Sequence, residues 1–412
     1  MTQQPSPILA LTESAPAGPN QALKARIAAA VEANRAEILD LSHRIHAHPE
    51  PAFEEVRAAG WVADAVRAHG FAVEHPAGSL ATAVRGRLRG GQAGPSGTEG
   101  PRIGILAEYD ALPGLGHGCG HNTMAASGVG AAIALAEVAP ELAGEIVFLG
   151  TPAEERGSGK QIMIEDGLFD GLDAALLFHP SDMTHLICNL LVSEDVEITF
   201  HGVQAHAASD PWAGRNALDA LILLFTSVGL WRQQLKPEAR VHGVIREGGT
   251  AANIIPDRTA AWFMIRSPDE VEYARMRTRF EELCRAAALA ADCQVDVAFS
   301  GLARTMRNNG VLAERFGANL AAYGVLAGPQ PDNLGSSDMG NVSHLLPTIH
   351  PSIAICPAGV PGHSIEFRDA AGSADADEVT LLVATVIAQT ACELLTDPDL
   401  VAAAWREFRA DG

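Results

Sequence analysis

Short apolar runs alternate with helical patterns in the first half of the chain, and this alternation restricts the fold more than any other feature. The runs are RIGILAEYD at 102–110, EIVFLGTP at 145–152 and DAALLFHP at 173–180, with a small-residue helical stretch between the first two. Strands that alternate with helices predict a mixed, mostly parallel sheet with helices on both faces, an α/β fold. In such sheets the functional side chains gather beyond the carboxyl ends of the strands.

The pattern changes near Leu191, where VSEDVEITFHG alternates as a half-exposed strand does. The expected order from there is β-α-β-β-α-β, which is typical of a ferredoxin-like module of roughly 110 residues. We therefore predict a catalytic domain made of 21–190 and 303–412, an inserted ferredoxin-like α+β domain at 191–302, and a flexible lead at 1–20. Beyond the insertion, the final helix is expected from about 375 to 395.

Composition excludes some classes of partner. The 29 basic and 50 acidic residues give a formal net charge of −21, which repels nucleic acid and anionic membrane surfaces. The N-terminus has neither the basic start nor the apolar stretch of a signal peptide, and no 18-residue apolar run is evident elsewhere. The six cysteines have no framework spacing. We expect a cytoplasmic protein with reduced thiols and no membrane or nucleic-acid partner.

Two adjacent glutamates, Glu154 and Glu155, follow the apolar run at 145–152 in GTPAEERGSGK. Adjacent carboxylates repel, and one of them normally needs a cation to stay ionised beside a strand end. The functional interpretation is that one glutamate binds a metal while the other acts as general base toward metal-bound water. The alternative is a solvated surface pair, which the strand before it and the glycines after it make less favourable.

The stretch GHGCGHN at 116–122 separates Cys119 from His121 by one glycine. Their side chains can converge if Gly120 relaxes the backbone. Thiolate and imidazole suit Zn²⁺, and also Mn²⁺ or Co²⁺ when carboxylates complete the shell. The alternative is a glycine-rich turn with incidental histidines. Three further residues at strand ends complete a five-ligand set for two metals that share a bridge: Glu155, His179 and His363.

Three other side chains have supporting roles in this interpretation. Asp110 and His117 would lie just outside the ligands, with the aspartate orienting a ligand imidazole. His206 precedes a helix in the inserted module and could donate a hydrogen bond to an oxyanion, provided that the module of its own or of a partner subunit closes over the metals. Taken alone, a histidine in AHAA is more often a cap or a surface residue.

Six motifs in this order resemble one enzyme family: AEYDALPGLGHGCGHN, GTPAEERGSGK, HGVQAHAASDPWAGRNALDA, ANIIPDR, SSDMGNVSHLLPTIHP and PGHSIEF. Together they resemble the aminoacylase and carboxypeptidase G family of dinuclear metallopeptidases. Within it they resemble the amidohydrolase branch, which includes aminobenzoyl-glutamate hydrolases, auxin-conjugate hydrolases and β-alanyl dipeptidase-like proteins. The resemblance covers nearly the whole chain, from IHAHPEPAFEE at 45–55 to the last helix.

The resemblance implies a zinc-peptidase catalytic domain and an inserted lid that also makes a homodimer or a higher homo-oligomer. It implies Glu154 as the general base and His206 as the oxyanion donor, while Asn253 and Arg266 fall where lid residues hold a substrate carboxylate. Glu108 stands where many relatives outside this branch have the histidine of an HxD motif, so His121 must replace that ligand. The implied metal ligands are Cys119, which would bridge, His121, Glu155, His179 and His363.

The implied reaction is hydrolysis of the amide bond between an acyl, aroyl or aminoacyl group and an amino acid with a free carboxylate. Two divalent ions, zinc or else manganese or cobalt, would lower the pKa of a bridging water from about 15.7 toward 7. Glu154 would accept its proton and pass it to the leaving amine. Two alternatives stay open: a strict dipeptidase or carboxypeptidase that acts on free dipeptides, and a catalytically silent relative with the same fold.

Overall fold

The computed structural model describes residues 19–94, 99–330 and 335–410. These residues form two compact units. The first unit runs to Asn189 and resumes from Met306 and from Asn341, and the second comprises Leu190–Thr305 together with residues 335–340. The expected lead at 1–20 lies outside the described residues, except that its last two residues already belong to the first helix.

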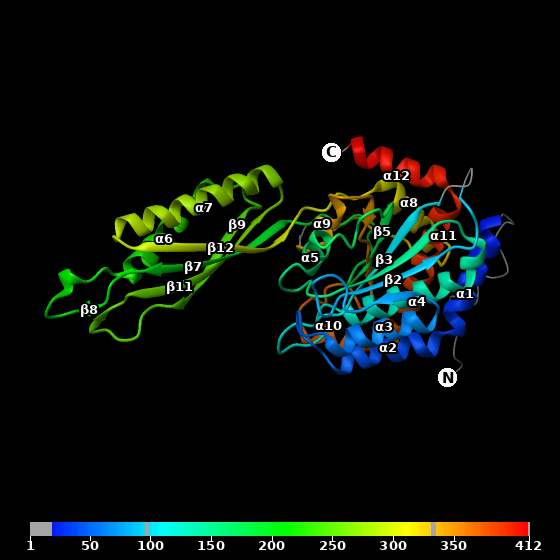
Figure 1. Cartoon of the computed structure of the whole chain (residues 1–412), viewed down its shortest axis with the longest axis horizontal. Helices are drawn as coiled ribbons and strands as arrows, with labels where there is room; N and C mark the ends of the chain where they lie inside the picture. The colour runs from blue at the N-terminus through cyan, green and yellow to red at the C-terminus, as the bar shows by residue number, and fades with distance from the viewer. Residues whose placement is uncertain (1–18, 95–98, 331–334, 411–412) are drawn as a thin grey trace. The chain divides into compact units, whose positions relative to one another are not determined.

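A six-stranded sheet forms the centre of the first unit (Figure 1). β3 pairs in parallel with both β4 and β5, β5 pairs in parallel with β13, and β1 and β2 add an antiparallel edge. β4 is buried along its whole length and β3 along nearly all of it, as expected for covered strands. In order across the sheet, the strands are β1 (Ala72–Glu74), β2 (Val84–Arg89), β4 (Glu145–Thr151), β3 (Arg102–Glu108), β5 (Ala174–Leu176) and β13 (Thr348–Ile349).

The run at 173–180 is not one strand, as the sequence predicts, but two. β5 ends at Leu176, and β6 (His179–Ser181) leaves the sheet to pair in parallel with β14 (Ser352–Ala354). The break after Leu176 therefore places His179 at the start of β6, in a second, two-stranded sheet, rather than at the end of β5.

Two long helices, α4 and α11, pack against each other and against β3. α1 and α2 pack on α4, and α3 packs on β2. The sequence expectation that the last helix ends near 395 is wrong, because α12 follows: Asp397 accepts hydrogen bonds from the backbone N–H groups of Asp399 and Leu400, and Pro398 takes the first helical position. The helices outside the inserted segment are α1 (Pro19–Ala33), α2 (Arg35–Ala47), α3 (Val56–Ala68), α4 (His121–Val138), α5 (Gly159–Glu165), α8 (Gly310–Ala321), α9 (Met339–Ser343), α10 (Ile365–Ala371), α11 (Ala374–Thr396) and α12 (Pro398–Ala410).

By length and composition, two segments of the described chain could cross a membrane, contrary to the sequence expectation. They are His121–Glu141, which contains α4, and α11. In the fold, 83% and 78% of their most apolar windows are buried, which is the pattern of core helices packed between other elements. Their apolar character is therefore accounted for by packing within the first unit.

The second unit is a four-stranded antiparallel sheet in the order β12-β7-β11-β9, with α6 and α7 packed on it (Figure 1). This is the predicted β-α-β-β-α-β chain order, and its core consists of apolar side chains from both helices and the sheet. The same unit contains a short antiparallel ribbon of β8 (Ala205–His206), which follows β7 in the chain, and β10 (Ile254–Ile255), which precedes β11. The main elements are β7 (Val192–His201), α6 (Ala217–Trp231), β9 (Arg240–Glu247), β11 (Arg258–Ser267), α7 (Glu270–Ala290) and β12 (Gln294–Ala303).

Candidate active site

Parallel pairing brings two chemically distinct loops to one edge of the sheet. Glu108 at the end of β3 pairs with Thr151 at the end of β4. The chain after β3 carries Asp110, and the chain after β4 carries Glu154 and Glu155. Because both strands run in the same direction, their polar extensions meet at the carboxyl edge of the sheet, as the sequence predicts.

Gly120 makes the turn that aims Cys119 and His121. It has φ of +79°, and a Cβ atom at this position would lie 2.7 Å from the Cγ atom of Pro180. Only glycine fits both the left-handed backbone and the close approach. α4 begins directly after this turn, so His121 occupies its first position while Cys119 stays in the loop.

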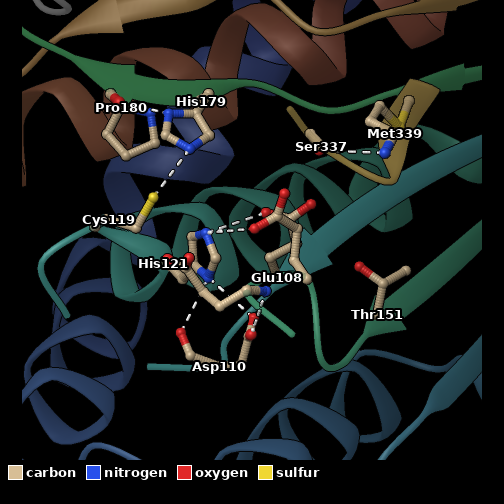
Figure 2. A network of polar contacts seen from close by, with 12 residues as sticks. Glu108, Asp110, Cys119, His121, Thr151, His179, Pro180, Ser337 and Met339 are labelled. Carbon is tan, nitrogen blue, oxygen red and sulfur yellow. Dashed lines mark hydrogen bonds and ion pairs between the residues drawn. The ribbon is translucent and has the colours of Figure 1, made fainter. Parts of the chain in front are cut away.

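All five predicted ligands come together around Cys119. Its Sγ atom lies 3.4 Å from Nε2 of His179 (Figure 2). The ligand atoms of Cys119, His121 and His179 lie within 4.8 Å of one another, and so do those of Cys119, Glu155 and His363. Cys119 belongs to both groups, which is the arrangement a bridging ligand requires.

Asp110 orients both kinds of ligand. Its Oδ1 atom and its backbone oxygen each lie 3.0 Å from Nδ1 of His121 (Figure 2). Its Oδ2 atom accepts a 2.9 Å hydrogen bond from the backbone N–H of Glu155. An Nδ1–H that donates to Asp110 leaves Nε2 of the neutral imidazole as the acceptor for a metal. The geometry gives Asp110 the orienting contacts that the sequence analysis assigned to it.

The electrostatics of the ligand atoms favour a bound cation. Burial opposes the imidazolium of His121, but the negative charge of the ionised Cys119 and of Asp110 outweighs it and raises the pKa of His121 well above its usual value. Burial raises the pKa values of Cys119 and Glu155. It lowers the pKa of His179 to about 4, with a smaller contribution from His121. A cation at Nε2 of His121 would take the place of the proton that this anionic surrounding attracts.

Buried ligand atoms that lack hydrogen bonds also indicate that this site can hold a metal ion. Among the described residues, Oε1 of Glu155 and Nε2 of His121 are buried without a hydrogen bond, although Oε2 of Glu108 lies 3.3 Å from the His121 nitrogen. Leaving such atoms unpaired typically costs about 1–3 kcal/mol each, and a divalent ion would satisfy both. The sulfur, nitrogen and carboxylate donors match the preferences of zinc and of neighbouring transition metals.

His117 lies apart from the two ligand groups. Its ring stacks on that of His46 with centroids 6.2 Å apart, and neither ring nitrogen has a hydrogen-bond partner in the described part of the chain. Burial, with smaller contributions from His121 and His46, lowers the pKa of His117 to about 3. A supporting role beside the metal site stays a prediction for this residue.

Sequence reasoning missed a buried ion pair beside the ligands. Nζ of Lys160 lies 2.5 Å from Oε1 of Glu108, and Oε2 of Glu108 lies 3.3 Å from Nε2 of His121. Burial opposes the ionised carboxylate of Glu108, but Lys160, His121 and His350 together outweigh it and hold the pKa of Glu108 below its usual value. The sequence marked Glu108 only as the replacement of an HxD histidine, and nothing in GSGK indicated that its lysine is fully buried.

His350 is a second residue that the sequence analysis did not single out. Its ring meets that of His179 edge to face, with centroids 5.6 Å apart, and the side chain is fully buried. Burial, assisted by His179, lowers its pKa to about 3. His350 is therefore an uncharged ring that packs against the imidazole of the predicted ligand His179. Its presence in the motif SSDMGNVSHLLPTIHP was the only available signal.

Comparison with known proteins identifies this arrangement. The model of peptidase family M20/M25/M40 matches residues 104–388, which include every proposed metal ligand. This chain belongs to that family. Members of peptidase family M20 are metal-dependent hydrolases of amide and peptide bonds, and this chain is one of them.

Named M20 relatives cover most of the chain. It is 37% identical to the Xaa-Arg dipeptidase of Mus musculus over 94% of this chain and 92% of the relative. It is 31% identical to a chain of the p-aminobenzoyl-glutamate hydrolase of Escherichia coli K12, over 72% of this chain and 64% of the relative. A Bacillus subtilis structure, described as a dinuclear metal-binding peptidase of family M20, has the same fold, with a TM-score of 0.64, 20% identity and coverage of 88% of this chain and 99% of that one.

The remaining predicted site residues of this M20 chain lie in the second unit. Nδ1 of His206 accepts 3.2 Å hydrogen bonds from the backbone N–H groups of Ala208 and Ser209. The backbone oxygen of Asn253 accepts from Ala207, so His206 and Asn253 are neighbours on the β8–β10 ribbon. Arg266 is not brought to them, because it lies near the opposite end of β11, roughly 26 Å along the strand from Arg258.

Proposed function

We propose that this M20 enzyme hydrolyses the amide bond between an acyl, aroyl or aminoacyl group and an amino acid with a free carboxylate, with two divalent ions. The observation that carries the proposal is the pair of ligand groups that share Cys119. The dinuclear description of the Bacillus subtilis structure supports two ions. The names of the two relatives supply the substrate classes: dipeptides ending in arginine and the amide of aminobenzoate with glutamate.

The chain's own residues divide the reaction between them. Bound divalent ions would acidify a coordinated water and polarise the scissile carbonyl. Oε2 of Glu154 lies 4.0 Å from Nε2 of His121, so its carboxylate stands beside the ligands without belonging to either group around Cys119. Glu154 accepts the proton of the attacking water and returns it to the leaving amine. Asp110 keeps His121 and the backbone of Glu155 in place throughout.

His206 is the proposed donor to the oxyanion. Because its Nδ1 accepts two backbone N–H groups, the neutral ring carries its proton on Nε2. That Nε2–H is the kind of donor that stabilises a developing negative charge on the carbonyl oxygen. Asn253, its neighbour on the ribbon, is the proposed contact to the substrate carboxylate. Arg266 is the second proposed contact, and another copy of the chain would have to supply it.

A substrate panel tests the proposed reaction. Xaa-Arg dipeptides, N-acyl amino acids and aminobenzoyl-glutamate would be compared by kcat/KM on the zinc-, manganese- and cobalt-loaded enzyme. The near full-length similarity to the Xaa-Arg dipeptidase favours dipeptides, and the net charge of −21 attracts a cationic substrate. Cleavage restricted to free dipeptides would assign a strict dipeptidase. No cleavage of any amide by the loaded enzyme would contradict the proposal.

Removal of the metal is expected to abolish activity and to lower stability. A ligand present at 100 times its Kd stabilises the folded state by about 2.7 kcal/mol, so dialysis against a chelator should lower the melting temperature and remove about two ions per chain, as measured by elemental analysis. Adding zinc, manganese or cobalt should restore both properties. Full activity in the chelated, metal-free enzyme would overturn the metal assignment. We propose zinc as the resident ion, with manganese or cobalt as alternatives.

We also propose that two copies associate through α6 and β9. On α6, Leu223 and Leu230 lie seven residues apart on one face and are 38% and 72% exposed. Ile245 on β9 is 49% exposed. It lies near α6, because both Ile245 and Leu218 of α6 are close to Gly248: a Cβ atom on this glycine would lie 3.8 Å from Ile245 and 3.9 Å from Leu218. β9 ends the order of the four-stranded sheet, and an end strand can pair with the same strand of a second copy.

The association predicts a clear change of mass in solution. Leu230→Glu combined with Ile245→Glu is expected to convert the wild-type dimer into monomers, because each glutamate would have to lose its hydration in the interface. Sedimentation velocity at micromolar concentration would measure the change. Leu289→Glu on α7 is the matched control, since Leu289 is 83% exposed and lies outside this face. A monomeric wild type, or a double variant that stays dimeric, would contradict the proposed interface.

A cytoplasmic location is our proposal for the cell. The six cysteines are unpaired in the structure, and two of them, Cys284 and Cys392, are fully buried. Free thiols persist in a reducing compartment. Cell fractionation would test this location.

A further inference from the structure

The segment that begins with HPEPAFEE has no part in the mechanism so far, yet it supplies a buried carboxylate close to the site. Glu55 is fully buried. Its Oε1 atom accepts a 2.8 Å hydrogen bond from the backbone N–H of Ala153, and its Oε2 atom accepts a 2.9 Å hydrogen bond from the hydroxyl of Thr82. Ala153 directly precedes Glu154, so Glu55 binds the backbone that carries the proposed general base.

The backbone at Ala153 is unusual and needs this support. Its φ angle is +59°, a left-handed conformation that costs energy for a residue with a Cβ atom. Its carbonyl oxygen accepts a hydrogen bond from Gly159, and the N–H of Glu155 is bound by Asp110. The turn is therefore held on both sides of Glu154: by Glu55 before it and by Asp110 after it.

The rest of the segment contacts both loops at the carboxyl edge of the sheet. The backbone oxygen of Glu50 accepts a 2.9 Å hydrogen bond from Ala111, next to Asp110. The ring of Phe53 lies over Gly157, where a Cβ atom would overlap it. The segment from Glu50 to Glu55 thus touches the loop after β3 and the loop after β4, although neither is near it in sequence.

Burying the carboxylate of Glu55 costs free energy, which indicates that the side chain is needed to hold the groups that it binds. Burial, with a smaller contribution from Asp110, raises its pKa to about 7. An apolar residue of similar volume would avoid that cost, but it would leave the Ala153 N–H and the Thr82 hydroxyl without this acceptor. The two hydrogen bonds of Glu55 can form with a charged or a neutral side chain, because the Thr82 hydroxyl can donate or accept.

We infer that Glu55 is a positioning residue, which holds the Ala153 turn so that Glu154 and Glu155 are aimed at the metal site. The inference rests on the roles proposed above for these two glutamates. Glu55 acts through the backbone and does not touch metal or substrate. A displacement of about 1 Å in a catalytic group can slow turnover roughly 10²-fold, which sets the expected scale of its effect.

Three variants separate hydrogen bonding from charge. Glu55→Asp keeps the charge but withdraws the carboxylate by one methylene group, so Ala153 loses its acceptor. We expect kcat to fall roughly 10- to 100-fold with KM nearly unchanged, and cobalt affinity to fall by a similar factor. Glu55→Gln keeps an oxygen for Ala153 and an N–H for Thr82, and should stay within about threefold of wild type. Glu54→Asp is the matched control, because Glu54 is exposed.

The absorption spectrum of the cobalt-loaded protein reports on the ligand geometry independently of activity. It should change in Glu55→Asp and not in Glu55→Gln. Val138→Ala, a cavity variant in the last turn of α4, should lower the melting temperature without changing the spectrum, which separates positioning from general destabilisation. If Glu55→Asp does not fold, Thr82→Val replaces it, since loss of the hydroxyl releases Oε2 of Glu55 and should weaken cobalt binding several-fold.

The outcomes distinguish this inference from the proposed function. A wild-type enzyme that binds cobalt and hydrolyses amides, together with a Glu55→Asp variant that keeps wild-type kcat and spectrum, would overturn the positioning role alone. A Glu55→Gln variant as impaired as Glu55→Asp would also overturn it, because keeping the hydrogen bonds to Ala153 and Thr82 would then not preserve the activity. A wild type that neither binds metal nor cleaves any amide would instead overturn the function on which the inference rests. In the Thr82→Val experiment, unchanged cobalt affinity would count against the inference.

Discussion

Replacing Glu154 with glutamine is expected to slow amide hydrolysis by about 10²- to 10⁴-fold, the usual contribution of a general acid–base group. The amide of glutamine cannot accept the proton of the attacking water, although it has nearly the same size as the carboxylate. Because Glu154 is outside both ligand groups that share Cys119, the variant should still bind about two ions per chain. The fall should therefore appear in kcat, with metal content unchanged by elemental analysis.

The control for this experiment is Glu137→Gln, which makes the same chemical change on an exposed side chain of α4. It should behave as the wild type does. A Glu154→Gln enzyme that binds metal and keeps wild-type turnover would show that another group accepts the proton. Metal loss in Glu154→Gln would show instead that Glu154 is a ligand, and the group formed by Glu108, His121 and Glu154 would then be part of the metal site.

Replacing Cys119 with serine is expected to cost the enzyme both metal and activity. Cys119 belongs to the group with His121 and His179 and to the group with Glu155 and His363, so its loss weakens both sites. Changes to groups that only orient a ligand lower metal affinity 10- to 100-fold, and loss of a bridging thiolate should exceed about 100-fold. Serine does not replace it, because its hydroxyl is far less acidic and a poorer ligand for zinc.

Elemental analysis after gel filtration would measure the metal content of Cys119→Ser, and kcat/KM on the best substrate of the panel would measure its activity. Cys356→Ser is the matched control, since Cys356 is also a free thiol of intermediate exposure but lies in no ligand group within the described residues. If Cys119→Ser kept two ions and full activity, the stretch at 116–122 would be a glycine-rich turn and nothing more.

Local patterns in the sequence were enough for the fold class. β3, β4 and the ferredoxin-like order of the second unit follow from apolar runs with the correct period, bounded by glycine and proline, and these are properties of neighbouring residues. The patterns failed where a few residues decide an element. Pro398 begins an additional helix after α11, and the run at 173–180 divides into β5 and β6. The edge strand β1 has only three residues, which are too few to show a period.

The candidate ligands can also be predicted from the sequence, because each has a side chain with metal chemistry and lies near the end of an apolar run or at the glycine-rich turn around Gly120. Glu55, Lys160 and His350 were not. A glutamate or lysine is normally exposed, and its burial is known only when distant segments have packed around it.

The sequence by itself determined that this chain forms a parallel-stranded α/β domain with an inserted ferredoxin-like unit, and which side chains could hold metal. The tertiary structure decided which carboxylates serve other purposes: Asp110 orients His121, Glu108 pairs with Lys160, and Glu55 binds Ala153. The reason is physical. Periodicity and turn chemistry act between residues close in the chain, whereas the environment that charges, neutralises or orients a buried carboxylate comes from groups tens of residues away.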